Sequence, residues 1–227
     1  MKLLIKGFEN EVVFSNQYIN VIQIENKALF QSITNQLNTA INGEVDETDV
    51  VLLSDNGDEL DFENTAYMMT DLYNIDINNK KILTKIQEKI LKDFSLENVS
   101  NIDKNIQEIR EILISEVNEF PLEIGIKDDV RLNDILKLFC IRIEKSNFTD
   151  IVKRIEAVID IIANLKVASI LVIPNIRSYL DNYQIIEIYK YSLYNGIRIL
   201  ILESNKYKKS KYEKVLLIDK NFDDYYV

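Results

Sequence analysis

The chain has 227 residues, of which 47% are hydrophobic, and its formal net charge is -10 because 37 Asp and Glu side chains outnumber 27 Lys and Arg side chains. A chain of this size can bury a substantial core, in one large or two small domains. It contains no histidine and one cysteine, which excludes a Ser-His-Asp triad, a Cys-His pair, a histidine-ligated zinc site and an internal disulfide. Carboxylate chemistry remains, including the binding of hard cations such as Ca²⁺ or Mg²⁺, although an acidic surface that serves solubility explains the same balance.

Residues 1 to about 60 are predicted to be rich in β-strands. The short apolar runs KLLIKGF, EVVFS and YINVIQI alternate with turn residues, and VVLLS follows near residues 50–54. The apolar spacing of KALFQSITNQL predicts a helix over about residues 27–40. A strand therefore leads directly into a helix at Glu25 to Lys27.

From about residue 60 to residue 165 the β pattern gives way to helical spacing. This spacing is present in TAYMMTDLYNI, KKILTKIQEKILKDF, NIDKNIQEIREILISEV, RLNDILKLFCIRI and TDIVKRIEAVIDIIANL. The whole middle of the chain is therefore predicted to be helical. Cys140 lies in the apolar run LKLFCIRI and is expected to be a small buried side chain.

From about Val167 the α/β pattern returns. ASILVIP and IRILILES are near-continuous apolar runs, a helix is predicted between them over Asn182–Tyr194, and KVLLID is a last short strand. Two buried strands joined by an amphipathic helix are typical of a parallel βαβ crossover that is covered on both faces.

The two ends of the chain are predicted to fold together into one parallel-type α/β sheet. Either end alone would make an uncomfortably small domain, and a content of only 5 Gly and 2 Pro argues against long flexible linkers. We therefore expect a discontinuous α/β head domain, residues 1–60 and 165–227, and an inserted α-helical leg domain, residues 61–164. No apolar run is long enough for a membrane span, and MKLLIKGFENE does not resemble a signal peptide, so we expect a soluble, cytoplasmic protein.

The junctions between strands and helices lack the residues of a nucleotide site. A phosphate-binding loop needs glycines so that the backbone can approach the phosphate, yet the junction at Glu25, Asn26 and Lys27 has none, and Glu25 would repel an anion. The second junction, VIPNIRSYLDN, has no glycine either. The predicted sheet is that of a nucleotide-binding protein without its nucleotide-binding chemistry, so no nucleotide cofactor is expected.

Several segments, in their order along the chain, resemble a known family. After the β-rich start come TAYMMTDLYNIDINNKKIL, then IEKSNFTDIVKRIEAVIDIIANLKVASILVIPNIRSYLDNYQIIEIYKYSLYNGIRILILES, and a lysine-rich loop followed by VLLIDKNFDDYYV. Over nearly its whole length the chain is similar to the short form of the type II-A CRISPR-associated accessory protein of spacer acquisition, the Csn-two family. The resemblance rests on pattern, element order and the C-terminal third rather than on a catalytic signature.

This resemblance implies both a fold and a function. Members of the family have an α/β head that resembles a P-loop ATPase without its phosphate loop, and a helical leg inserted into that head. They assemble as a ring-shaped homotetramer and bind double-stranded DNA ends through the ring in the presence of Ca²⁺. They act with the CRISPR integrase complex and the RNA-guided nuclease in antiviral defence, so neither enzymatic activity nor membrane binding is expected here.

The net charge argues against DNA binding, because affinity for DNA comes largely from neutralising phosphates with Lys and Arg. Local basic clusters can outweigh the net charge, since salt screens charges beyond about 8 to 10 Å. The candidate DNA-binding residues are Lys145, Lys153 and Arg154, which flank the last predicted leg helix, and Lys206, Lys208, Lys209 and Lys211, in the loop before KVLLID. A solvated turn or helix face explains either cluster as well, but four copies in a ring would make modest contacts count.

Acidic residues gather around PLEIGIKDD, in a predicted bend between helices. They do not match an EF-hand loop, but carboxylates together with carbonyls exposed near Pro121 and Gly125 could supply the oxygen ligands that Ca²⁺ prefers. The resemblance places calcium in the leg, where it would be structural. The candidate ligands are Glu119, Glu123, Asp128 and Asp129, and ordinary acidity of a helix surface explains each of them as well.

Three classes of function therefore stay open. A non-catalytic DNA-binding ring is favoured. A divergent NTPase is disfavoured by the missing phosphate loop. The third is a protein–protein adaptor, whose acidic surface would bind a basic partner and whose helical leg would be the docking element.

Overall fold

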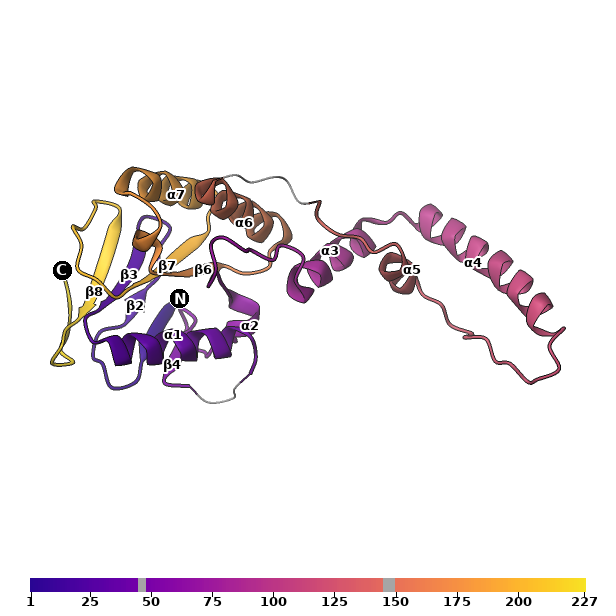
Figure 1. Ribbon diagram of the computed structural model, residues 1–227, viewed down its shortest axis with the longest axis horizontal. Coiled ribbons are helices and arrows are strands. Elements are labelled where there is room, and N and C mark those ends of the chain that lie inside the picture. The colour runs from indigo at the N-terminus through magenta and orange to yellow at the C-terminus, as the bar shows by residue number, and fades with distance from the viewer. Residues whose placement is uncertain (45–47, 145–149) are drawn as a thin grey trace. The chain divides into compact units, whose positions relative to one another are not determined.

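The computed structural model describes residues 1–44, 48–144 and 150–227 (Figure 1). The chain divides into two compact units. The sheet unit consists of Met1–Asp76 and Ser146–Val227, and the helical unit of Ile77–Lys145. None of the described helices combines the length and the apolar character needed to cross a membrane.

A six-stranded sheet forms the centre of the sheet unit. Its strands lie in the order β5 (Ala66–Met68), β6 (Ile170–Pro174), β7 (Arg198–Glu203), β3 (Ile19–Ile24), β8 (Glu213–Ile218) and β9 (Asp224–Tyr226). All neighbours are parallel except β8 and β9, which pair antiparallel. Because β3 lies between β7 and β8, the first and last thirds of the chain contribute to the same sheet, and the mixed α/β fold predicted from the sequence is confirmed.

Helices cover both faces of this sheet, as its apolar strands require. Every residue of β3 is buried. α6 (Ile151–Leu165) and α7 (Asn182–Tyr194) pack side by side on one face, and α1 (Lys27–Ile41) lies on the other (Figure 1). α7, preceded by the short helix η1 (Ile176–Ser178), connects β6 to the parallel strand β7, which confirms the predicted crossover.

A second, smaller sheet belongs to the same unit. It is antiparallel, in the order β2 (Val12–Val13), β1 (Lys2–Ile5) and β4 (Val50–Leu53). The prediction of a single sheet is therefore wrong. β1 and β4 bury only alternate residues, as sheets with one covered face do, and their buried side chains join α1 and the large sheet in one core.

Three helices make up the described part of the helical unit. They are α3 (Lys80–Asp93), α4 (Leu96–Val117) and α5 (Leu132–Leu138). α5 packs against α3 and against α4. The Asn78 side chain exchanges two hydrogen bonds with the backbone of Ile143, at 3.0 and 2.8 Å, and so ties the beginning of the unit to its end.

Most helices begin at a polar residue that caps free backbone amides. Asn26, Asn79, Ser95, Asp150 and Asp181 are the caps of α1, α3, α4, α6 and α7. Such a cap stabilises a helix by about 1 kcal/mol. These caps help to fix the residue at which each helix begins.

The helix predicted for TAYMMTDLYNI is wrong. Residues Phe62–Thr65 form the one-turn helix α2, and the next three form β5, because they pair with β6 at the edge of the large sheet. β5 and α6 both belong to the sheet unit, whereas the expected leg domain, residues 61–164, contained them.

The prediction that Cys140 is buried is also wrong. Its side chain is exposed, because α5 ends at Leu138 and the chain turns away at Cys140, where φ is 49°. Leu138 and Phe139 are likewise exposed, at 74% and 75%. The apolar run LKLFCIRI therefore does not mark a continuous buried element.

Candidate nucleic-acid interface

Residues 204–212 connect β7 to β8 and form the lysine loop. Lys206, Lys208, Lys209 and Lys211 are all exposed in it. Lys206 forms an ion pair of 2.7 Å with Glu25, which raises the pKa of this lysine, and Lys209 donates to the carbonyl of Val227. The loop thus brings four of the predicted DNA-binding residues together on one segment of the sheet unit.

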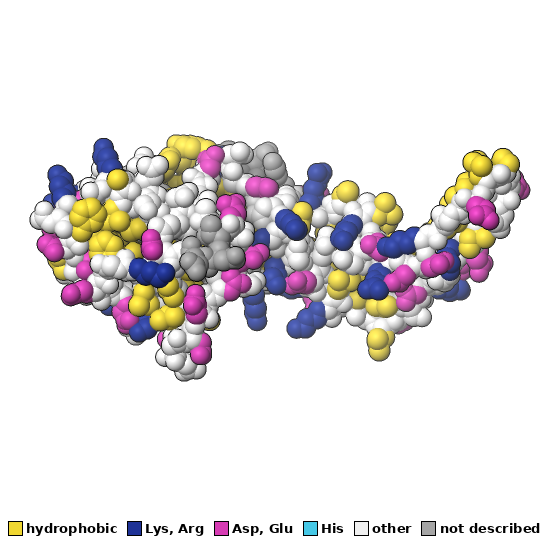
Figure 2. Space-filling model, turned by 90° about the horizontal axis from the view of Figure 1, so that it is seen from below, with side chains coloured by type: hydrophobic (Ala, Val, Ile, Leu, Met, Phe, Trp, Pro, Cys, Tyr) yellow, Lys and Arg dark blue, Asp and Glu magenta, His cyan; other side chains and the backbone are white. Residues whose placement is uncertain are grey.

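The other predicted basic residues lie on a different element or outside the described residues. Lys153 is exposed on α6 and pairs with Glu156 at 2.6 Å, which raises its pKa. Arg154, also on α6, donates to the backbone carbonyl of Tyr73. Lys145 lies outside the described residues. Figure 2 shows Lys and Arg side chains interspersed with Asp and Glu on the face in view, so no single basic face is visible there.

A buried charged cluster lies under the lysine loop. The Arg177 side chain, 12% exposed, pairs with Glu213 and lies 3.9 Å from Glu203, and both carboxylates are almost fully buried. The Tyr189 hydroxyl donates to Glu213 over 2.7 Å. We call these four residues together with Tyr207 the arginine cluster.

Burial raises the pKa values of three side chains in this cluster. Desolvation raises the pKa of Glu203 to about 7, and the charge of Glu213 adds to this, while the backbone N–H and the charge of Arg177 oppose it. The pKa values of Tyr189 and Tyr207 are also raised, mainly by burial. One arginine therefore faces two carboxylates, of which one changes its charge near neutral pH.

At the junction between β3 and α1, the first amides of the helix already have an acceptor in the same chain. The Asn26 side chain accepts hydrogen bonds from the amides of Ala28 and Leu29, at 3.0 and 3.1 Å. These are the first-turn amides that a phosphate would otherwise use. The neighbouring Glu25 carboxylate is nine-tenths buried in its ion pair with Lys206.

The predicted calcium ligands are all exposed in the helical unit. Asp128 forms an ion pair with Arg110, and Asp129 pairs with Arg131 at 2.8 Å. Within the described residues, no three carboxylates come close enough together to hold a metal ion. The described residues of one chain therefore do not assemble a calcium site in this arrangement.

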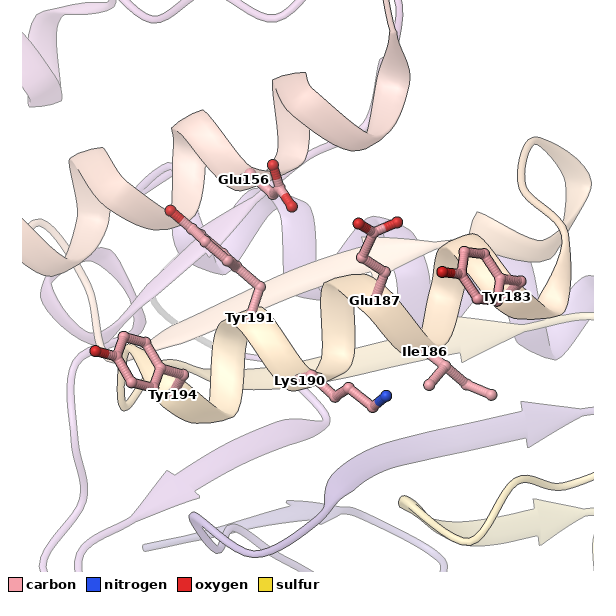
Figure 3. A pocket seen from close by; sticks show the side chains of 7 residues that line it. All are labelled: Glu156, Tyr183, Ile186, Glu187, Lys190, Tyr191 and Tyr194. Atoms are coloured by element: carbon pink, nitrogen blue, oxygen red, sulfur yellow. The ribbon is translucent and has the colours of Figure 1, made fainter.

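A groove of about 530 Å³ runs between α6 and α7 (Figure 3). Glu156 of α6 and Glu187 and Tyr191 of α7 point toward one another across it, and Tyr183 and Tyr194 stand at its ends. The Tyr191 hydroxyl donates to Asp160 over 2.7 Å, and this bond, followed by desolvation, raises its pKa to about 12. The groove is aromatic and of mixed charge, because Lys190 lines it together with the two carboxylates.

The fold and these sites define an α/β protein with a largely parallel sheet, in which Asn26 occupies the first amides of α1 and a lysine loop is exposed. A family model described as CRISPR-associated protein (Cas_Csn2) matches residues 43–222. The chain therefore belongs to the Csn2 family of type II-A CRISPR-associated proteins, as the resemblance predicted. The matched range includes both the lysine loop and the arginine cluster.

Reasoning from the sequence missed the arginine cluster. One signal was present: Glu203 ends the apolar run IRILILE, and a charged residue directly after buried strand residues needs a partner. The partner, Arg177, lies 26 positions earlier, and only the parallel pairing of β6 with β7 brings the two together.

Proposed function

We propose that the protein is a non-catalytic double-stranded DNA-binding protein that engages DNA ends during CRISPR spacer acquisition. It would act as a homotetrameric ring, alongside the CRISPR integrase complex and the RNA-guided nuclease. The lysine loop carries this proposal, because it presents four exposed ammonium groups on one short segment. The bond from the Ser210 N–H to Glu213 holds this segment to the sheet unit. Phosphate contacts of this kind supply most sequence-independent affinity for DNA.

The capped junction at Asn26 supports a role without nucleotide hydrolysis. The amides of Ala28 and Leu29 already have an acceptor in the same chain, and a nucleotide phosphate would have to displace it while facing Glu25. A divergent NTPase is therefore not favoured by this site.

The surface of α4 supports assembly with other copies. The helix has no buried residue, yet Ile109, Ile112 and Leu113 are 58%, 64% and 48% exposed. Large exposed apolar side chains in a row are a feature of interfaces between proteins. A ring built through such contacts would multiply the lysine loops that face one duplex, and multivalency would raise the overall affinity.

The proposal includes calcium dependence, with an ion that draws ligands from more than one chain. Two of the four candidate carboxylates already have arginine partners, so an ion would have to displace Arg110 or Arg131, or draw ligands from a second chain. Binding assays should therefore be run both with calcium and with a chelator.

The direct test is the affinity for a labelled linear duplex, measured by fluorescence anisotropy across a salt series. Binding that weakens steeply with salt is expected, since each neutralised phosphate contributes a slope of about -0.9 to the logarithmic plot. A lack of binding at low salt, with and without calcium, would overturn the proposal.

A protein adaptor is the second candidate, and the groove between α6 and α7 favours it. Exposed tyrosines are enriched where proteins meet, and the exposed carboxylate of Glu187 would suit a basic side chain of a partner. Under this alternative the unaltered protein would bind no DNA, so the salt series separates the two candidates.

A further inference from the structure

Arg177 lies where the buried part of the sheet unit meets the lysine loop. Its guanidinium donates to Glu213 through Nη2 and to Asn182 through Nη1, the latter at 2.9 Å, and its backbone N–H donates to Glu203 at 3.1 Å. The carbon atom at the centre of the guanidinium stacks over the ring of Tyr207, 3.7 Å from its centroid. This single side chain therefore contacts α7, the beginning of β8 and the middle of the lysine loop.

Two further sets of hydrogen bonds hold the rest of the loop, one to Glu213 of the arginine cluster and one to Asn175. Glu213, which Arg177 holds, accepts a hydrogen bond from the backbone N–H of Ser210 through its second carboxylate oxygen, at 2.8 Å. At the other end of the loop, the N–H and the hydroxyl of Ser204 both donate to the Asn175 side chain, at 3.1 and 2.9 Å. The beginning, middle and end of the loop thus each have an anchor in the interior.

We propose that Arg177 is a positioning residue that holds the lysine loop in the conformation that meets DNA. This inference rests on the proposed DNA binding. Arg177 lies under the lysines and is itself mostly buried, so it acts through Tyr207 and Glu213 rather than by touching a phosphate.

Without such contacts the lysine loop would be poorly ordered in the free protein. Lys206, Lys208, Lys209 and Lys211 repel one another, and a free loop would lose conformational entropy when DNA orders it. The loop contains neither glycine nor proline, so its path is not set by special backbone residues. The stacking of Arg177 on Tyr207 and the hydrogen bond that the Ser210 N–H donates to Glu213 order the loop before DNA binds.

Arginine suits this position better than lysine. A planar guanidinium can stack on an aromatic ring while its N–H groups donate in the plane, whereas an ammonium is a compact point charge. A lysine at this position would keep the charge between Glu203 and Glu213 but lose the stack and the bond to Asn182. The substitution Arg177→Lys therefore separates positioning from charge.

The test measures loop order and DNA affinity on the same full-length variants. Tyr207→Leu removes the stack and leaves every charge and every lysine in place, and it keeps the proposal testable if Arg177→Lys does not fold. Tyr194→Leu is the matched control, because Tyr194 is 89% exposed and is the last residue of α7, at the opposite end of the helix from Asn182. Hydrogen exchange is followed for peptides covering residues 204–212 and, for comparison, residues 19–24.

Both test variants are expected to exchange at least about tenfold faster over residues 204–212, with unchanged exchange over residues 19–24, and to bind linear duplex about fivefold to tenfold more weakly. The control should match the unaltered protein in both readouts. Unchanged exchange over the loop would overturn the proposal, and so would faster exchange with unchanged DNA affinity. If the unaltered protein binds no DNA, the proposed function fails and, with it, the role of Arg177 in DNA binding; the exchange data would then show separately whether Arg177 orders the loop.

Discussion

The sheet unit and the helical unit place their apolar side chains in opposite ways. In the sheet unit all residues of β3 are buried, and one core cluster includes residues of α1 and of both sheets. In the helical unit no residue of α4 is buried, and Leu96 and Ile112 are 89% and 64% exposed. The sheet unit is therefore stabilised by its own interior, whereas α4 leaves large apolar side chains exposed within the helical unit, where another copy of the chain could cover them.

The largest expected difference between the two units is in the free energy of unfolding that is lost when a leucine is replaced by alanine. Leu202→Ala, at a position with 0% exposure in the large sheet, should lower the free energy of unfolding by about 3 kcal/mol through lost burial and a cavity. Leu113→Ala in α4, where the leucine is 48% exposed, should change it by less than about 0.5 kcal/mol in the monomer. Urea unfolding measures both, and equal losses would contradict the division into a buried and an exposed unit.

Glu203 should give the sheet unit a pH dependence of its own. Its pKa is raised from 4.5 to about 7 in the fold, so between these values the unfolded chain releases a proton that the folded protein retains. Stability should therefore fall as pH rises from about 4.5 to about 7, by at most about 3 kcal/mol, and stay level above this window. Glu203→Gln should remove this fall, so that its gain in stability over the unaltered protein is largest at pH 8, less than half as large at pH 5.5 and small at pH 4.

The control for this prediction is Glu187→Gln, which neutralises an exposed carboxylate on α7. It should leave the pH profile parallel to that of the unaltered protein. If the pH profile of the Glu203→Gln variant were also parallel to that of the unaltered protein, burial of Glu203 would not be the source of the pH dependence.

Charged residues on the exposed face of α4 should weaken assembly without unfolding the monomer. The double substitution Ile112→Asp and Leu113→Asp should reduce self-association by about 2 kcal/mol, roughly 30-fold, because two apolar contacts become charged ones. Gln107→Glu adds a charge on another face of the same helix and should have little effect. Sedimentation velocity measures the assembly, and an unchanged oligomer in the double variant would exclude this face as the interface.

Removing positive charge from the lysine loop should weaken DNA binding and leave the fold intact. The double substitution Lys208→Gln and Lys211→Gln should weaken DNA binding about tenfold at low salt and flatten its salt dependence. The pair Lys92→Gln and Lys104→Gln removes the same charge from exposed positions of the helical unit and should have a smaller effect. Equal effects would mean that net charge, rather than the loop, decides the affinity.

The sequence was a good guide to the elements that local patterns define. The helices over Lys27–Ile41 and Asn182–Tyr194 were predicted because apolar residues recur there at helical spacing. β5 was missed because its three residues become a strand only by pairing with β6, 104 positions later, and no local pattern marks that contact.

The part of the candidate site that is local in the sequence could be predicted, and the part that depends on contacts between distant residues could not. Lys206, Lys208, Lys209 and Lys211 follow one another in the chain, so composition alone identified the loop. Arg177, which holds it, could not be assigned because its partners lie on three elements that only the fold brings together. Cys140 was misjudged because an apolar run does not reveal where a helix ends.

The central claim is that the protein binds DNA by its ends, and a comparison of linear with covalently closed duplex of equal length and sequence tests it most directly. A gel-shift series with calcium or chelator, at several salt concentrations, gives both affinities. The account predicts preferential binding of the linear form, weakened by salt and by chelation. Equal binding of the two forms would contradict end binding through a ring, and absence of binding to either would contradict the role in DNA binding altogether.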